Sequence, residues 1–309
     1  MNRLTREHPL ANTDPMDDAA PLALLSDDAA PFRVVRPAAG VAATPMIFAS
    51  PHSGRNYPSA MMAASLLDRQ AIRRSEDAHV DELIDAAPDF GHTLMTAEFA
   101  RAYLDVNREP WELDPSMFED ELPPFARART ARVAAGLGAI ARIVCEGQEI
   151  YARKLTFAEA EGRVQAVHQP YHAALAELLA ETKAAFGFAL LIDCHSMPAA
   201  AARGPAGEVC DMVLGDRFGA ACAGQVTRFV EARLKDLGYR VARNAPYAGG
   251  YTTEHYGRPG RKIHVLQIEI SRALYFDEAE LSLTPGFARL REHLQRLFAA
   301  LAAANWAGL

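Results

Sequence analysis

Short apolar runs alternate along this sequence with long alanine- and leucine-rich stretches of helical period. This alternation predicts an α/β fold with a mainly parallel mixed sheet and helices on both of its faces. The expected strands are residues 46–49, 93–97, 102–106, 189–192, 212–214, 240–242 and 265–270. The expected helices are residues 68–87, 124–153, 157–185, 217–237 and 285–304. No glycine-rich phosphate-binding motif follows a strand, so a nucleotide cofactor is not indicated.

A chain of 309 residues, half of them hydrophobic, is able to bury a large core as one unit. We therefore expect a single domain over residues 31–309. Residues 1–30 mix charges, prolines and alanines and lack the apolar core of a signal peptide, so we expect a loosely ordered N-terminal tail there.

The net charge of −7, without a long basic run, argues against a nucleic-acid partner and against binding to an anionic membrane surface. No apolar stretch is long enough for a transmembrane helix. The four cysteines are widely spaced and form no C-x-x-C pair, which indicates neither a disulfide framework nor a zinc knuckle, and the expected compartment is the cytoplasm. A small molecule is the expected partner, and the sequence does not indicate an oligomeric state.

Two histidines stand just after apolar runs, His52 in "SPHSG" and His195 in "IDCHSMP". Ligands of open α/β sheets bind beyond the carboxyl ends of the strands, so these two side chains are expected to meet. The segment "SEDAHVDEL" adds Glu76 and Asp77, which either stabilise a helix N-terminus or act as metal ligands. Two imidazoles and one carboxylate form a ligand set that is used for catalytic zinc.

The segment "HVLQIEIS" places Glu269 in the middle of a strand that is otherwise apolar on alternate positions. An ionised carboxylate in such a place is costly unless it is functional or paired. Two interpretations stay open: Glu269 is a general base, or it forms a buried salt bridge with Arg272 or another arginine.

The segment "RAYLDVNRE" ends with Asn107 and Arg108 and begins with Arg101. The planar fork of arginine matches a carboxylate, which favours an acidic substrate, although a surface ion pair is the alternative for any single arginine. The glycine- and tyrosine-rich segment "YAGGYTTEHYG" is either a mobile flap bearing Tyr251 or Thr252, or a static turn.

Together these segments resemble the N-formylglutamate amidohydrolases, a family of metal-dependent enzymes whose fold is similar to that of the zinc carboxypeptidases (phosphorylase/hydrolase-like). The resemblance extends over about residues 46–277. It rests on seven blocks in order, namely "SPHSGRNYP", "SEDAHVDEL", "YLDVNREP", "PYHAAL", "IDCHSMP", "APYAGGYTTEHYG" and "LQIEISRALYFDE".

The resemblance implies that His52 and His195 bind the metal, Zn²⁺ or another divalent ion. It implies Asp77 as the carboxylate ligand, with Glu76 as its competitor. The chain departs from the carboxypeptidase pattern at Arg55, where that pattern has a glutamate.

The same resemblance implies that Glu269 is the general base and that Arg101 lies near the developing oxyanion. Asn107 and Arg108 are expected to hold a substrate carboxylate. Tyr251, Thr252 and Arg272 are the further expected substrate-binding residues.

The activity implied by the resemblance is hydrolysis of N-formyl-L-glutamate to formate and L-glutamate, in histidine degradation. One alternative is a deacylase or carboxypeptidase-like amidase acting on another small acidic N-acyl amino acid or peptide. A non-catalytic small-molecule binding protein is the alternative of another class.

Overall fold

The computed structural model of the protein describes residues 30–204, 206–306 and 308–309. The predicted N-terminal tail lies outside the described residues, except for Ala30. The division of the chain into this tail and one domain over residues 31–309 stays a prediction.

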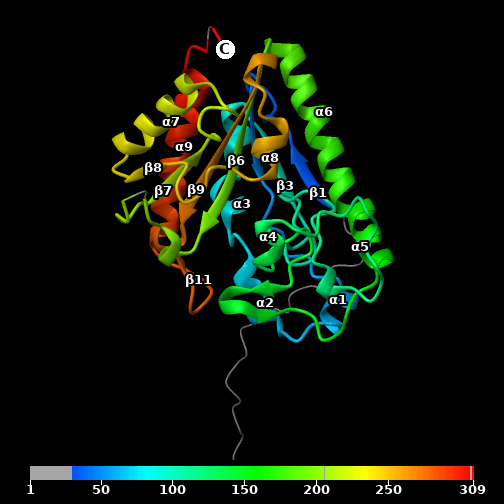
Figure 1. The fold of residues 1–309 in the computed structure, drawn as a ribbon. Coiled ribbons are helices and arrows are strands. Elements are labelled where there is room, and N and C mark those ends of the chain that lie inside the picture. The colour runs from blue at the N-terminus through cyan, green and yellow to red at the C-terminus, as the bar shows by residue number, and fades with distance from the viewer. Residues whose placement is uncertain (1–29, 205, 307) are drawn as a thin grey trace, which may run out of the picture.

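A seven-stranded sheet with the order β1-β3-β2-β6-β9-β7-β8 forms the centre of the fold (Figure 1). Its strands are β1 (Phe32–Val35), β2 (Met46–Ser50), β3 (Thr93–Ala97), β6 (Ala189–Met197), β7 (Met212–Gly215), β8 (Val241–Arg243) and β9 (Ile263–Ser271). The four central strands, β3, β2, β6 and β9, are parallel, whereas β1 is antiparallel to β3 and β7 is antiparallel to β9. This arrangement confirms the mainly parallel mixed sheet.

Helices cover both faces of the sheet because alternate side chains of the buried strands point to opposite sides. Phe48, Ile192 and Ile268 pack in one core with α3 (Val80–Leu83), α7 (Gly224–Asp236) and α9 (Gly286–Ala303). Ile47 and Leu191 pack in the other core with α5 (Phe157–Arg163) and α6 (Gln169–Phe186). In Figure 1, α7 and α9 lie on the left of the sheet and α6 on the right.

Shorter elements connect these layers. The short helices are α1 (Ser59–Ala63), α2 (Arg69–Ile72), η1 (Arg73–Ser75), η2 (Ala87–Phe90), η3 (Pro115–Met117), α4 (Ala131–Ala134), η4 (Cys145–Gly147), the π-helical η5 (Val164–His168), η6 (Ala199–Ala201), α8 (Tyr251–Tyr256), η7 (Pro259–Arg261) and η8 (Arg272–Leu274). Two small hairpins pair β4 (Ile143–Val144) with β5 (Gln148–Glu149), and β10 (Phe276–Asp277) with β11 (Ser282–Leu283). Among the described helices, none has the length and apolar character needed to cross a membrane.

Two predicted elements are wrong. Residues 102–106 are turns and coil rather than a strand, and their apolar side chains, such as Leu104, fill the core beside α6. The predicted helix over residues 124–153 contains the short α4 and the β4–β5 hairpin with η4 between its strands. Gly136, at φ +75°, follows α4, and the chain then turns back so that the Ala139 amide bonds the Glu112 carbonyl at 2.7 Å.

Other boundaries differ from the predictions. The predicted helix over residues 68–87 is divided into α2, η1 and α3, and the one over 217–237 begins only at Gly224. The edge strand β1 was not predicted, since four residues are too few to show a clear strand period. The helices over 157–185 and 285–304 are confirmed.

Candidate metal and active site

The candidate site is built at the carboxyl ends of neighbouring parallel strands. His52 follows the end of β2, and His195 stands on β6 in register with Glu269 on β9. Asp77 comes from the segment after η1, where its amide donates to the His52 carbonyl at 3.0 Å. The topology thus brings four side chains from distant parts of the sequence to one edge of the sheet.

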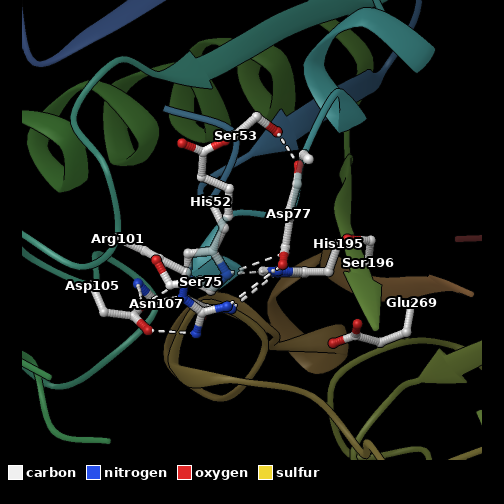
Figure 2. Close-up of polar contacts among 12 residues, drawn as sticks. His52, Ser53, Ser75, Asp77, Arg101, Asp105, Asn107, His195, Ser196 and Glu269 are labelled. Carbon is white, nitrogen blue, oxygen red and sulfur yellow. Dashed lines mark hydrogen bonds and ion pairs between the residues drawn. The ribbon is translucent and has the colours of Figure 1, made fainter. Parts of the chain in front are cut away.

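Three potential ligand atoms converge in this buried place, as Figure 2 shows. Asp77 Oδ2 lies 3.3 Å from His52 Nδ1 and 3.0 Å from His195 Nδ1, and the two Nδ1 atoms are 3.1 Å apart. Each of the three side chains is at least 97% buried. Ligands placed about 2.0–2.1 Å from a tetrahedral zinc ion lie roughly 3.3 Å from one another, so the spacing of these atoms fits such an ion.

The outer nitrogens of both imidazoles face carboxylates. His52 Nε2 lies 2.7 Å from Asp105 Oδ1, and His195 Nε2 lies 3.0 Å from Asp193 Oδ2. When each Nε2–H donates to its carboxylate, each Nδ1 presents a lone pair, and two lone pairs then face each other beside the Asp77 carboxylate. Such a donor set is stabilised by a cation, and a carboxylate behind a histidine is the usual support of a metal ligand.

Asp77 is the carboxylate that the structure brings to the histidines. Burial raises the pKa of Asp77, but hydrogen bonds with His195 and His52 and the charge of Arg101 outweigh it and hold this pKa well below its usual value. Arg272 Nη2 lies 3.3 Å from Asp77 Oδ1 and orients the carboxylate from behind. An ionised carboxylate is the form that binds a metal.

Glu76 occupies a different environment although it is adjacent in sequence. Its carboxylate accepts hydrogen bonds from the Tyr57 hydroxyl at 2.7 Å and from Arg73 Nε at 3.2 Å. The Glu76 side chain is therefore held by structural partners and is not part of the converging group.

Glu269 is 7% exposed and accepts a hydrogen bond from Gln267 Nε2 at 2.8 Å. Burial raises the pKa of Glu269 to about 7, although the charge of the neighbouring His195 acts in the opposite direction. No arginine of the described chain forms an ion pair with Glu269, and Arg272 instead binds Asp77 and the Glu76 carbonyl. The salt-bridge interpretation of Glu269 with Arg272 therefore does not hold.

The converging group opens into a cavity of about 650 Å³. The lining of this cavity includes the polar and charged side chains of Arg101, Arg108, Tyr247, Gln267 and Glu269. Arg101 Nη2 bonds Asp105 at 2.8 Å, and its Nη1 lies 3.5 Å from Asp77. A cavity of this size, lined by the guanidinium group of Arg101 beside the two histidines, is able to hold a small acidic molecule.

Comparison with known proteins agrees with this geometry. The profile of the N-formylglutamate amidohydrolase family matches residues 44–276, which include all the strands that carry the converging group. The chain belongs to this family.

Two relatives of this N-formylglutamate amidohydrolase chain are N-formylglutamate deformylases. The one from Pseudomonas aeruginosa is 31% identical over 238 residues, which are 76% of this chain and 83% of the relative. The one from Pseudomonas putida is 28% identical over 239 residues, with the same two shares covered. The crystal structure of N-formylglutamate amidohydrolase from Ralstonia eutropha JMP134 has a TM-score of 0.83 and 37% identity, covering 89% of this chain and 98% of that chain.

Asn107 lies at the junction of several parts of the site in this family member. Its Nδ2 is 3.0 Å from His195 Nε2 and 3.4 Å from Asp193 Oδ2, while its Oδ1 accepts from the Thr252 amide at 2.8 Å. Arg108 donates from Nε and Nη1 to the Leu137 and Asn107 carbonyls. Both residues line the cavity, and their predicted binding of a substrate carboxylate stays a prediction.

Tyr251 and Thr252 do not line this cavity. Thr252 is fully buried, and Tyr251 lines a neighbouring cavity of about 460 Å³ and stacks on His255. Tyr247, four residues before Tyr251, is the tyrosine of this segment that does line the cavity of the converging group. Nothing in the sequence distinguishes Tyr247 from Tyr251, since both stand beside alanine or glycine.

His168 and His172 support the backbone around Asn107. His172 Nε2 lies 2.7 Å from the Val106 carbonyl oxygen, and His168 Nε2 lies 3.0 Å from the Arg108 carbonyl oxygen. Burial lowers the pKa of His172 to about 3 and also lowers the pKa of His168, so both rings are neutral at physiological pH. The π-helical turn η5 ends at His168, and the two rings pack with centroids 4.2 Å apart.

Asp105 and Asp193 are the members of the site to which the sequence analysis gave no role. Their signal is positional: Asp105 stands two residues before Asn107, and Asp193 stands two residues before His195 on the same face of β6. A carboxylate two residues from a candidate metal-binding histidine is typical of the hydrogen-bond partner that orients the imidazole.

Proposed function

We propose that this protein is a metal-dependent amidohydrolase that converts N-formyl-L-glutamate and water into formate and L-glutamate. The observation that carries the proposal is the buried His52, Asp77 and His195 group beside Glu269, in a chain of the N-formylglutamate amidohydrolase family. The names of the two Pseudomonas relatives support the choice of substrate.

His52, Asp77 and His195 are the residues that would hold Zn²⁺ or another divalent ion. When bound, such an ion acts as a Lewis acid that polarises a carbonyl group and lowers the pKa of a water molecule. Asp105 and Asp193 would fix the two imidazoles with Nδ1 facing the ion.

Glu269 takes the role of general base and then of general acid. Its carboxylate accepts a proton as the water oxygen forms a bond with the formyl carbon, and it returns this proton to the amide nitrogen as the C–N bond breaks. A pKa of about 7 suits both transfers near neutral pH. In this proposal Arg101 donates to the oxygen that becomes negatively charged, and Arg108 binds the α-carboxylate of the substrate. Both arginines line the cavity, which supports these roles.

The proposal includes a place for this reaction in histidine degradation in the cytoplasm. The alternative activity is deacylation of another small acidic N-acyl amino acid or peptide in the same cavity. A non-catalytic binding protein is less well supported, because such a protein has no need of a buried carboxylate with a raised pKa next to two histidines.

One experiment separates these functions. The metal content of the purified protein is measured, and the metal-loaded protein is then tested with N-formyl, N-acetyl and N-succinyl amino acids. We expect about one divalent ion per chain and the highest kcat/KM for N-formyl-L-glutamate. Preference for another acyl group would favour the alternative deacylase, and binding without turnover of any substrate would favour the binding protein.

A further inference from the structure

The arginines that line the cavity differ in how their guanidinium groups are engaged. Five have partners within the described chain: Arg101 and Arg272 with Asp77, Arg132 with Glu112, Arg217 with Glu254, and Arg108 with the carbonyl oxygens of Leu137 and Asn107. The sixth, Arg74, has no hydrogen-bond or ion-pair partner for its side chain among the described residues.

The Arg74 side chain is partly buried, and its Nε atom is fully buried without a hydrogen-bond acceptor. A buried N–H group without a partner is unfavourable, and a guanidinium group is among the groups for which this cost is largest. Because this Nε is closed to solvent, an anion bound in the cavity would meet the terminal Nη groups, which also have no partner among the described residues and are not buried. Carboxylates match this end of the guanidinium fork.

Arg74 lies in η1, three residues before Asp77. Three residues span at most about 11 Å, so its backbone stays close to the metal-binding group. The Arg74 carbonyl accepts a hydrogen bond from Cys145 Sγ at 3.5 Å, which fixes η1 against the β4–β5 hairpin on the wall of the cavity. The Arg74 guanidinium group forms no ion pair with Asp77 or Asp105, whereas Arg101 lies within 4 Å of both, so Arg74 is further from these two carboxylates than Arg101 is.

We propose that Arg74 binds the side-chain carboxylate of the substrate and thereby sets the preference for a glutamate side chain. This inference rests on the proposed function, because it requires that an N-acyl amino acid occupies the cavity.

The two carboxylates of N-formylglutamate lie at different distances from the scissile bond. The α-carboxylate is attached to the carbon that bears the amide nitrogen, whereas two further methylene groups separate that carbon from the side-chain carboxylate. Arg108, which lies 3.8 Å from Asp105 beside the converging group, suits the nearer carboxylate. Arg74 has no partner among the described residues and is further than Arg101 from Asp77 and Asp105, so it suits the side-chain carboxylate.

The test compares N-formyl-L-glutamate with N-formyl-L-glutamine, which has the same shape but no side-chain charge. The kcat/KM of each substrate is measured for the wild type, for Arg74→Gln and for Arg69→Gln. Arg69 is a matched control because it lies five residues earlier in the same segment, carries the same charge and does not line the cavity.

We expect the wild type to prefer the glutamate substrate. Arg74→Gln should lower kcat/KM for N-formyl-L-glutamate by roughly 10- to 100-fold, the loss typical of a charge-assisted hydrogen bond, and should leave the glutamine substrate nearly unchanged. Arg69→Gln should change neither value.

Equal losses on both substrates in Arg74→Gln would overturn this inference while leaving the proposed function intact. A wild-type protein that hydrolyses neither substrate would overturn the proposed function, and the inference with it.

If Arg74→Gln does not fold, Arg74→Lys takes its place, since lysine keeps the charge but lacks the planar guanidinium fork. A smaller selective loss on the glutamate substrate is then expected, and an equal loss on both substrates would again contradict the inference.

Discussion

His195 and Glu269 are register partners on the neighbouring parallel strands β6 and β9. Register partners in a parallel sheet point to the same face, so the sheet itself holds a metal-ligand candidate beside a candidate base. Both strands are 9 residues long, and every residue except Ile263 at the start of β9 is buried, which gives this pair a rigid support. Substitution of either side chain is therefore expected to change the chemistry of the site more than the fold.

Two adjacent carboxylates are expected to behave differently. Asp77→Asn should abolish metal binding, because it removes the anionic ligand between the two histidines. Glu76→Gln should keep the metal and lower thermal stability, because Glu76 accepts hydrogen bonds from Tyr57 and Arg73. Metal content after dialysis and the melting temperature distinguish the variants. Loss of metal in Glu76→Gln with retention in Asp77→Asn would reverse the assignment of the ligand.

The carboxylates behind the histidines are expected to tune metal affinity. Asp105→Asn and Asp193→Asn each weaken the hydrogen bond to an imidazole Nε2 and should weaken metal binding by roughly 10- to 100-fold. Competition with a chelator of known affinity measures this change. An unchanged dissociation constant in both variants would show that the two carboxylates serve folding alone.

Arg108→Ala is expected to lower kcat/KM for N-formyl-L-glutamate by roughly 10- to 150-fold, because a charge-assisted hydrogen bond to the α-carboxylate is lost. An analogue with an α-carboxamide should lose much less. Since Arg108 also donates to the Asn107 carbonyl, a purely supporting role would give equal losses on both compounds.

Acid should destabilise the protein in part through His92, which is fully buried and is not a member of the converging group of His52, Asp77 and His195. Burial lowers the pKa of His92 from 6.5 to about 4, and its Nε2 lies 3.1 Å from the Phe298 carbonyl oxygen. The unfolded chain takes up a proton below about pH 6.5 whereas the folded chain does not until about pH 4, so stability is lost as the pH falls through this window. The contribution is about 3 kcal/mol at most.

The variant His92→Gln isolates this contribution. Its free energy of unfolding should be lower than that of the wild type at pH 7, and the difference should shrink as the pH falls to about 4. Denaturant unfolding at several pH values measures both curves. Curves that stay parallel over this range would show that His92 does not titrate as proposed.

The chain order of apolar runs was sufficient to predict the centre of this fold. Met46–Ser50 and Ala189–Met197 are buried on both faces, so their composition alone indicates strands, and the histidines that follow or end them mark the edge where ligands bind. Glu269 was visible for the same reason, because a carboxylate interrupts an apolar strand.

Other parts of the site depend on contacts between distant segments and could not be predicted. The region around Leu137 has the alanine-rich composition of a helix, yet its backbone turns to meet Glu112 and Asp105 through hydrogen bonds at Ala139. Arg74 follows Arg73 in the sequence, and only the structure shows that Arg73 binds Glu76 while the Arg74 side chain has no partner among the described residues.

The most direct test of the account is the turnover of metal-loaded Glu269→Gln. The amide keeps an oxygen that accepts from Gln267 Nε2, so fold and metal content should match the wild type, but it cannot accept the proton from water. We expect about one metal ion per chain, an unchanged melting temperature and a kcat for N-formyl-L-glutamate reduced by roughly 10²- to 10⁴-fold. A metal-loaded Glu269→Gln protein with kcat close to that of the wild type would contradict the account.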